Sequence, residues 1–272
     1  MDSQGLPKIL IFDSGVGGLS ILQAINRRHP YCSLFYASDN AAFPYGTKNE
    51  GYLINRVNRV LSRLQATVEP DLIVIACNSA STVALPSIRQ CFAQPVIGVV
   101  PAIKPAARLS KTKVIGLLAT PGTVKRAYTR QLIADYASDC QVISLGSNEL
   151  VSLVERKLQG RPVHREQLSL LLAPLIDKIE MDTLVMACTH FPLLKTELQA
   201  ILPQVSCWVD SADAIASRVT YWLECLQLQR EANCLATVEH CCLFTAKTPE
   251  VSALSPYLLQ QHLGEPQFVH VD

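Results

Sequence analysis

Two cysteines stand in matching places along the chain, each directly after an apolar run. Cys77 follows Asp71–Ala76, and Cys188 follows Thr183–Ala187. Short apolar runs of this kind are typical of buried parallel strands. Both thiols are therefore expected at the carboxyl ends of strands, where open α/β sheets bind ligands. A thiolate is the reactive form of cysteine, so the pair predicts thiol chemistry at a ligand site.

Short polar residues follow each cysteine and support this interpretation. Asn78 and Ser79 come after one thiol, and Thr189 and His190 come after the other. We expect both thiols at the N-terminus of the next helix, where the helix dipole and free backbone N–H groups stabilise a thiolate and accept an anion. The alternative is a pair of buried strand-end thiols, because free cysteine is commonly buried. Two matched positions with polar followers favour the functional interpretation.

The glycine-rich segment Asp13–Gly18 follows a third apolar run, Lys8–Phe12. It does not fit the dinucleotide-binding pattern G-x-G-x-x-G, because residue 20 is Ser, and it lacks the spacing and the Lys of a Walker A loop. We expect a tight strand-to-helix turn with an acid, Asp13, at the end of the strand. The loop at residues 38–47 holds a phenol and a glycine that could bind an anionic ligand or form a packed turn.

The elements that must position these residues repeat one order: apolar run, small polar loop, helix. The order occurs at Lys8–Phe12, Asp71–Ala76, Lys113–Leu118 and Thr183–Ala187. It predicts βαβ units and a mostly parallel sheet. The first copy resembles the third and the second resembles the fourth, which indicates an internal duplication into two α/β halves. We expect helices at 19–28, 53–64, 149–158 and 211–227, and strands at 243–245 and 268–271.

The composition narrows the class of function. The chain has 272 residues, of which 49% are hydrophobic, so it can form two compact domains. The net charge of +1 arises from 24 basic and 23 acidic residues, which gives no broad positive field for nucleic acid. No run approaches the roughly 20 apolar residues of a membrane span, and Met1–Leu6 does not resemble a signal peptide. We expect a cytoplasmic protein with a small-molecule substrate and no membrane partner.

The chain has ten cysteines, and without a secretion signal we expect free thiols rather than disulfides. Five of them have no neighbouring residues that suggest a functional role, and we interpret these as buried packing residues: Cys32, Cys91, Cys140, Cys207 and Cys225. The cluster of Cys234, His240, Cys241 and Cys242 lacks the C-x₂-C spacing of common zinc sites, so no metal is expected there.

With these residues in view, the chain resembles the glutamate racemases over nearly its whole length. The resemblance rests on six segments: Phe12–Gly18, Ser38–Gly46, Ala76–Ser81, Gly98–Ala102, Leu153–Glu155 and Ala187–His190. It implies an α/β fold of two similar domains with mostly parallel sheets, related by a pseudo-twofold axis, with the active site in the cleft between them. The first domain would comprise residues 1–98 and 210–272 on the Cys77 side, and the second residues 99–209 on the Cys188 side.

The resemblance also implies roles. Cys77 would act on the α-proton of D-glutamate and Cys188 on that of L-glutamate, without a cofactor. Asp13 would assist Cys77, and His190 would assist Cys188, with Glu155 nearby. The substrate would be lined by Asp13, Ser14, Tyr45, Gly46, Asn78, Ser79, Thr189 and His190. The product would supply peptidoglycan synthesis, and the enzyme would be a homodimer.

Two segments depart from the family. Many members have Thr where this chain has Ser79, and Ser147–Ser152 lacks a Cys-Pro start. Some members carry a longer N-terminal extension tied to activation by UDP-N-acetylmuramoyl-alanine. Only seven residues precede the first expected strand here, so such activation is not the first expectation.

Several alternatives remain open at this stage. An aspartate racemase of the same family would use the same paired cysteines on a substrate one methylene shorter. A regulatory protein that binds DNA gyrase could retain the fold without the activity. Both cysteines keep their surrounding motifs here, which favours an active enzyme. A thiol–disulfide enzyme is disfavoured because Cys77 and Cys188 lie in no C-x-x-C motif.

Overall fold

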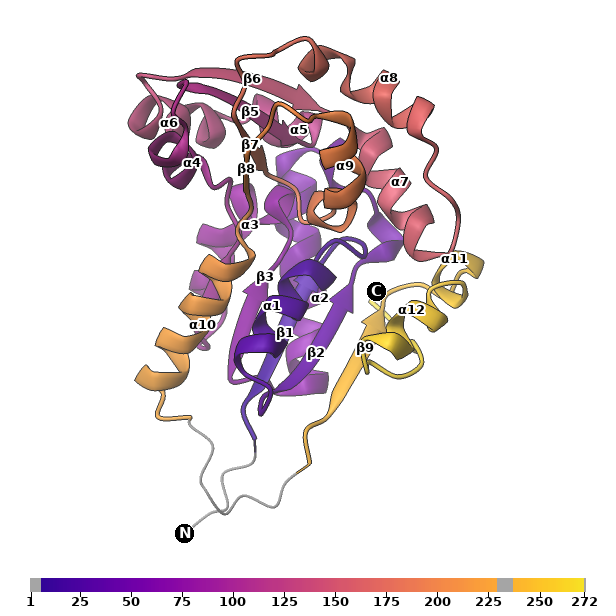
Figure 1. Ribbon diagram of the computed structural model, residues 1–272. Helices are drawn as coiled ribbons and strands as arrows, with labels where there is room; N and C mark the ends of the chain where they lie inside the picture. Colours follow the sequence, from indigo (N-terminus) through magenta and orange to yellow (C-terminus); the bar gives the residue numbers. More distant parts are fainter. Residues whose placement is uncertain (1–5, 229–236, 272) are drawn as a thin grey trace.

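The computed structural model describes residues 6–228 and 237–271, and its strands form two separate sheets (Figure 1). The six-stranded sheet has the order β10-β9-β2-β1-β3-β4, with β1 Lys8–Asp13, β2 Ser33–Ser38, β3 Leu72–Ile75, β4 Val96–Gly98, β9 His240–Phe244 and β10 Gln267–Phe268. The four-stranded sheet has the order β6-β5-β7-β8, with β5 Val114–Ala119, β6 Gln141–Gly146, β7 Thr183–Met186 and β8 Cys207–Val209. We call the parts built around these sheets the first lobe and the second lobe. Every strand pair in the described residues is parallel, which confirms the α/β prediction.

The two sheets share one topology. The order β2-β1-β3-β4 of the first lobe corresponds to β6-β5-β7-β8 of the second. The four apolar runs expected to be strands are β1, β3, β5 and β7, in the order in which the duplication paired them. The internal duplication predicted from short resemblances is therefore confirmed by the arrangement of the strands.

Residues of the central strands are buried on both faces, as parallel strands require. In β1, Ile9 and Ile11 belong to one hydrophobic cluster, whereas Leu10 and Phe12 belong to another on the opposite face. The helices of the first lobe are α1 Leu19–Arg28, α2 Glu50–Val68, α3 Asn78–Cys91, α10 Ala212–Cys225, α11 Pro249–Ser252 and α12 Ser255–Gln260. Because α1 packs with α10 and α2 packs with α3, each face of the sheet is covered by a helix pair.

The second lobe covers its sheet with α4 Ile103–Leu109, α5 Pro121–Lys125, α6 Ala127–Tyr136, α7 Asn148–Leu158, α8 Arg165–Ile176 and α9 Lys195–Ile201. Among the described residues, three short 3₁₀ turns lie in loops: η1 Asn40–Ala42, η2 Tyr45–Thr47 and η3 Phe191–Leu194. The expected helices at 19–28, 53–64, 149–158 and 211–227 are found as α1, α2, α7 and α10. Both tail strands exist and return to the first sheet, where β9 pairs with β2. β9 begins earlier than expected, and β10 ends at Phe268.

The remaining cysteines only partly follow the prediction. The nine described cysteines are free, and Cys32 is buried as expected. Cys91 and Cys225 are exposed, so interpreting them as buried packing residues was wrong: each is the last residue of its helix, α3 or α10. Cys140 and Cys207 are half-buried. Cys234 lies outside the described residues.

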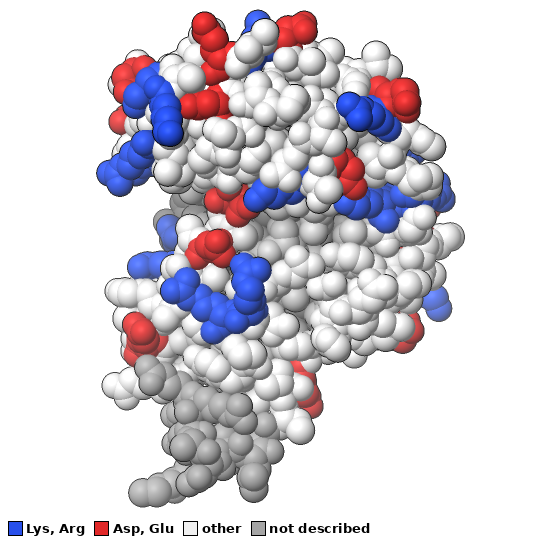
Figure 2. Space-filling model, in the orientation of Figure 1, with Lys and Arg blue, Asp and Glu red and all other residues white. Residues whose placement is uncertain are grey.

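Within residues 6–228 and 237–271, no group of three or more His, Cys, Asp or Glu side chains could hold a metal. No helix in the same ranges is long and apolar enough to cross a membrane. Basic and acidic side chains are interspersed over both lobes on the face shown in Figure 2.

Candidate active site

The carboxyl ends of the central strands of both lobes face one narrow cleft. Its lining residues are Asp13, Ser14, Phe43, Pro44, Tyr45, Gly46, Cys77, Asn78, Ser79, Thr120, Val151, Cys188, Thr189 and His190. The structure thus brings together all the predicted site residues except Glu155, which lies behind His190. Phe43, Pro44, Thr120 and Val151 were not predicted. The room left for the centres of water molecules is only about 20 Å³, so the lobes are closed on each other.

Cys77 is the N-cap residue of α3, directly after β3, where the helix prediction placed it. Its thiol is buried and lies 3.7 Å from the hydroxyl oxygen of Ser14. The expectation of a lowered pKa was wrong here. Burial raises the pKa of Cys77 well above its ordinary value, the nearby charge of Asp13 raises it further, and the hydrogen bond from the backbone of α3 offsets only a part. Cys77 is therefore a thiol at neutral pH.

Cys188 has a different environment, and its predicted position at a helix N-terminus was wrong. The short 3₁₀ turn η3 follows it at Phe191, and the α-helix α9 begins only at Lys195. In place of a helix dipole, the Cys188 Sγ atom has the His190 Nδ1 atom at 3.7 Å. The two matched thiols therefore have different neighbours: a helix N-terminus at Cys77 and an imidazole at Cys188.

His190 lies between Cys188 and Glu155. Its Nε2 atom is 2.8 Å from Glu155 Oε1, while its Nδ1 atom faces the thiol. Burial alone would lower the pKa of His190, but the hydrogen bonds and charges of Cys188 and Glu155 outweigh it and hold the pKa well above the ordinary value. The imidazolium form then supplies the positive charge that a Cys188 thiolate needs.

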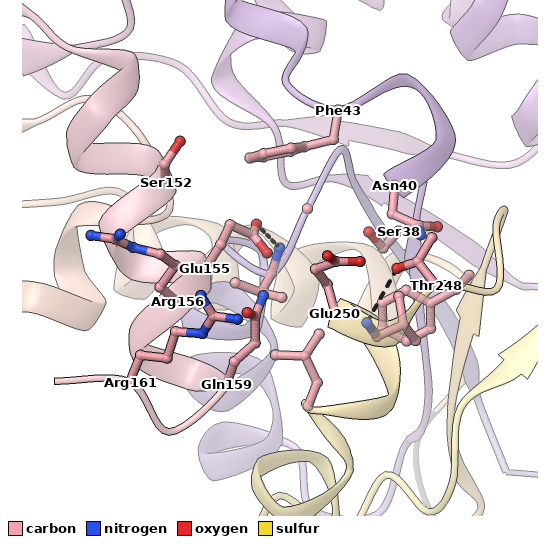
Figure 3. A pocket seen from close by; sticks show the side chains of 15 residues that line it. Ser38, Asn40, Phe43, Ser152, Glu155, Arg156, Gln159, Arg161, Thr248 and Glu250 are labelled. Carbon is pink, nitrogen blue, oxygen red and sulfur yellow. Dashed lines mark hydrogen bonds between the residues drawn. The ribbon is translucent and has the colours of Figure 1, made fainter.

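Glu155, on α7, also binds the glycine-rich loop of the first lobe. Its Oε1 atom accepts a hydrogen bond of 2.8 Å from the backbone N–H of Val16 (Figure 3). The approach is close: a Cβ atom on Gly15 would lie 2.2 Å from Glu155 Oε1, and one on Gly17 would lie 2.2 Å from His190 Nδ1. These two glycines are needed so that the loop can pack against the Glu155–His190 pair.

Asp13 joins the lobes from the other side of the cleft. It is fully buried, and its Oδ2 atom accepts a hydrogen bond of 2.8 Å from the Thr189 hydroxyl. Its Oδ1 atom accepts a bond of 3.3 Å from the Ser14 hydroxyl, which in turn contacts Cys77. Asp13 therefore reaches the Cys77 thiol through Ser14.

Tyr45 lines the cleft, but its phenol is turned away from it. The hydroxyl donates a hydrogen bond of 2.6 Å to Asp39, which Arg56 also contacts at 2.9 and 2.7 Å. A phenol has one proton to donate, so Tyr45 has none left for a ligand. Tyr45 and Gly46 can therefore offer only backbone groups to a ligand.

A larger cavity of about 410 Å³ lies beside the cleft (Figure 3). Phe43 lines both spaces, and its ring lies 6.1 Å from that of His190. The larger cavity contains no cysteine. We assign the chemistry to the narrow cleft because both strand-end thiols line it.

Sequence reasoning missed the hydroxyl groups that the second lobe directs at Ser79. The Ser79 Oγ atom is 3.2 Å from Thr120 Oγ1 and 3.5 Å from Thr123 Oγ1. A signal was available, because Thr120 is the second residue after the third apolar run, as Ser14 is the second residue after the first. Among the described residues, the buried Asn78 side-chain amide nitrogen has no hydrogen-bond partner, which is the state expected of a group that awaits a ligand.

Comparison with known proteins agrees with this site. The sequence model of the Asp/Glu/Hydantoin racemase family matches residues 19–219. The chain is 49% identical to the glutamate racemase of Klebsiella pneumoniae (strain 342) over 254 residues, covering 93% of this chain and 88% of that protein. It is 51% identical to the glutamate racemase of Pasteurella multocida (strain Pm70) over 233 residues, covering 86% of this chain and 87% of that protein. The structure of Escherichia coli glutamate racemase in complex with L-glutamate and the activator UDP-MurNAc-ala superposes with a TM-score of 0.91 at 44% identity, covering 98% of this chain and 99% of that one.

Proposed function

Because the chain belongs to the Asp/Glu/Hydantoin racemase family, we propose that Cys77 and Cys188 exchange a proton with the α-carbon of glutamate from opposite faces. The activity, the interconversion of L- and D-glutamate, follows from the match to glutamate racemases along nearly the whole chain. It is an isomerase reaction and supplies D-glutamate for peptidoglycan. The observation that carries the proposal is that two buried thiols from different lobes line one cleft.

Racemisation removes the α-proton from one face and returns a proton to the other. One thiolate acts as base and one thiol acts as acid, and the two exchange states in each turnover. Turnover of L-glutamate begins with the thiolate on Cys188, beside the His190 side chain, and with the proton on Cys77, whose pKa is raised by burial. This state is ready for L-glutamate, and the state with the proton on Cys188 is ready for D-glutamate. Two thiols suffice for this transfer, so the reaction needs no electron-sink cofactor.

The remaining cleft residues hold the substrate. Asn78 has an unpartnered amide in the cleft, and together with Ser79 and Thr189 it stabilises the charge that develops on the α-carboxylate. Ser14 and the backbone N–H groups of Tyr45 and Gly46 bind the side-chain carboxylate. This end of the cleft sets the preference for glutamate over the shorter aspartate.

The assignments at larger scale are also proposals. We propose residues 1–98 and 210–272 as one domain and 99–209 as the other, since each range contains the strands of one sheet. A cytoplasmic location is supported by the nine described cysteines being free thiols. A homodimer is supported by the resemblance to racemases that dimerise.

The two-thiol mechanism is tested by isotope exchange with matched variants. The purified protein is incubated with L-glutamate in D₂O without added cofactor, and loss of circular dichroism and entry of deuterium at the α-carbon are followed. Cys77→Ala and Cys188→Ala are expected to abolish racemisation, while Cys91→Ala, at an exposed thiol of α3, retains it. L-Aspartate is the competing substrate.

Each outcome has a distinct meaning. Preferred turnover of aspartate would establish the aspartate racemase alternative. Racemisation that survives either active-site substitution would overturn the two-thiol mechanism. Absence of turnover in the folded wild type, also after addition of UDP-MurNAc-ala, would favour a regulatory protein that has kept the fold.

A further inference from the structure

Three residues of the second lobe contact one residue of the first lobe, Ser79. Thr120 and Thr123 approach the Ser79 hydroxyl at 3.2 and 3.5 Å. Arg126 donates a hydrogen bond of 3.1 Å from Nη1 to the Ser79 backbone oxygen. All three residues lie on α5 or at its ends, since Thr120 is its N-cap and Arg126 its C-cap. The short helix α5 is therefore the part of the second lobe that contacts the start of α3, as their packing also indicates.

Arg126 is a buried cation whose partners lie mainly in the other lobe. Only 7% of its side chain is exposed, and Nη1 also donates to the Thr82 hydroxyl of α3 at 3.0 Å. Its ion pair with Glu50 is long, at 3.7 Å, and the Glu50 side chain is 66% exposed, so this pair contributes little. Burial of a charged group is costly unless it is hydrogen-bonded. The acceptors on α3 therefore hold Arg126 in place from the other lobe.

Arg126 lies at the corner between α5 and α6, where the backbone is held in place. The residue separates α5 from α6 in an extended conformation, with φ −69° and ψ 144°. The Thr129 hydroxyl donates a hydrogen bond of 2.6 Å to the Thr123 backbone oxygen, which ties α6 to α5. A rigid corner of this kind limits the positions that the guanidinium can reach. Its hydrogen bonds to α3 therefore depend on how the two lobes are placed relative to each other.

The same segment packs on the loop expected to bind the side-chain carboxylate. A Cβ atom on Gly122 would lie 2.8 Å from the Gly46 backbone oxygen, and one on Gly46 would lie 2.9 Å from the Thr120 Cβ atom. The segment from Thr120 to Arg126 thus contacts both the Tyr45–Gly46 loop and the start of α3. These are the two parts of the first lobe that must be placed accurately around the substrate.

We propose that Arg126 is a positioning residue that fixes the N-terminal turn of α3, and with it Cys77 and Asn78, when the cleft closes. The proposal rests on the two-thiol mechanism above. The carbonyl that Arg126 holds lies two residues after Cys77, so a shift of α3 would misplace the thiol and the amide together. The cation has a second effect, because its positive charge favours the thiolate of Cys77 that forms in each turnover.

The test compares Arg126→Met, which keeps the length of the side chain, with Arg126→Lys. For Arg126→Met we expect kcat/KM to fall about 10- to 100-fold, the scale of a misplaced reacting group, with a raised KM for both enantiomers. The deuterium isotope effect on kcat/KM with α-deuterated glutamate increases, because proton transfer becomes slower relative to binding. Arg126→Lys recovers part of the loss, since an ammonium can still donate to the Ser79 carbonyl.

Two control variants separate this role from a general effect of charge. Glu50→Gln removes the long ion pair, and Arg130→Gln removes an exposed cation on α6; both are expected to behave as wild type. Melting temperatures are measured for all variants. A variant that is only partly folded loses kcat in proportion, while its KM and its isotope effect stay unchanged.

The result that would overturn the proposal is an Arg126→Met enzyme whose KM and isotope effect equal those of the wild type. An equal loss in Glu50→Gln would also overturn it, because the ion pair and not the carbonyl contact would then matter. A wild-type protein without turnover would contradict the proposed function itself. That outcome can be told apart from the two results above, because both of them require an active wild type.

Discussion

At the scale of single residues, the two thiols are chemically unlike although they occupy matching positions. Cys77 caps a helix and is buried near Asp13, which raises its pKa. No α-helix begins directly after Cys188, and its thiol instead contacts His190, which is paired with Glu155. The two thiols therefore differ in their surroundings, and a two-base racemase needs two thiols that can hold different protonation states at the start of a turnover.

The charge of His190 predicts how its substitution depends on pH. A group whose pKa is raised in the folded state stabilises the protein fully below its unfolded pKa, about 6.5, and loses this effect as the pH rises through its folded pKa. We expect His190→Asn to lower the free energy of unfolding by about 1.5 to 3 kcal/mol near pH 6, the scale of a hydrogen bond to a charged group. The difference from wild type narrows as the pH rises into the alkaline range.

Urea unfolding between pH 6 and pH 10 measures this effect. His270→Asn is the control, because His270 is exposed and lies in no helix or strand, so its substitution should cause little change at any pH. A difference between His190→Asn and wild type that grows with pH would show that His190 is neutral in the folded protein.

At the scale of elements, the start of β7 is tied to the turn between α4 and β5 by one carboxylate. Asp182 accepts hydrogen bonds from the Ser110 hydroxyl at 2.7 Å and from the backbone N–H groups of Lys111 and Thr112 at 2.7 and 3.0 Å. Partial burial alone would raise the pKa of Asp182, but these hydrogen bonds and one from Thr183 lower it to about 2. These hydrogen bonds of Asp182 hold the start of β7, the strand that leads to Cys188.

Asp182→Asn is therefore expected to lower the free energy of unfolding by about 1 to 3 kcal/mol at pH 7, since several donors lose a charged acceptor. A lowered folded pKa stabilises the protein above the unfolded pKa of about 3.9, and this effect is lost as the pH falls toward 2. Denaturant unfolding from pH 7 down to pH 3 measures the difference. Asp177→Asn, at an exposed position after α8, is the control, and a loss that stays constant with pH would contradict the role of the charge.

At the scale of the whole molecule, the closed cleft is too small for the substrate. It leaves about 20 Å³ for water centres, room for about one water molecule, whereas glutamate is much larger. We therefore expect the two lobes to separate to admit glutamate and to close again before proton transfer. Closure makes the contacts between Asp13 and Thr189 and between Glu155 and Val16, which join residues of different lobes.

Small-angle X-ray scattering tests this opening. We expect the radius of gyration of the free enzyme to exceed that of the enzyme saturated with glutamate. The Cys77→Ala Cys188→Ala double variant, which retains the substrate-binding residues, should contract on binding without turnover. Identical scattering with and without glutamate would contradict the opening.

The sequence by itself determined the central strands and the polar residues at their ends. Apolar runs such as Lys8–Phe12 and Asp71–Ala76 are local patterns, because a strand buried on both faces needs apolar side chains at consecutive positions. The residues directly after such a strand must lie at the edge of the sheet. For that reason Asp13, Cys77 and Cys188 could be placed at the cleft without coordinates.

Only the tertiary structure decided which group each of these residues faces. The bond between Asp13 and Thr189, the contact of Arg126 with Ser79 and the turn of the Tyr45 phenol toward Asp39 leave no local pattern in the sequence. The first two join lobes whose relative placement depends on packing over the whole molecule, and the third depends on how one loop folds over its own sheet. Local periodicity specifies the elements, but the pKa of a buried thiol depends on charges brought to it from distant parts of the chain.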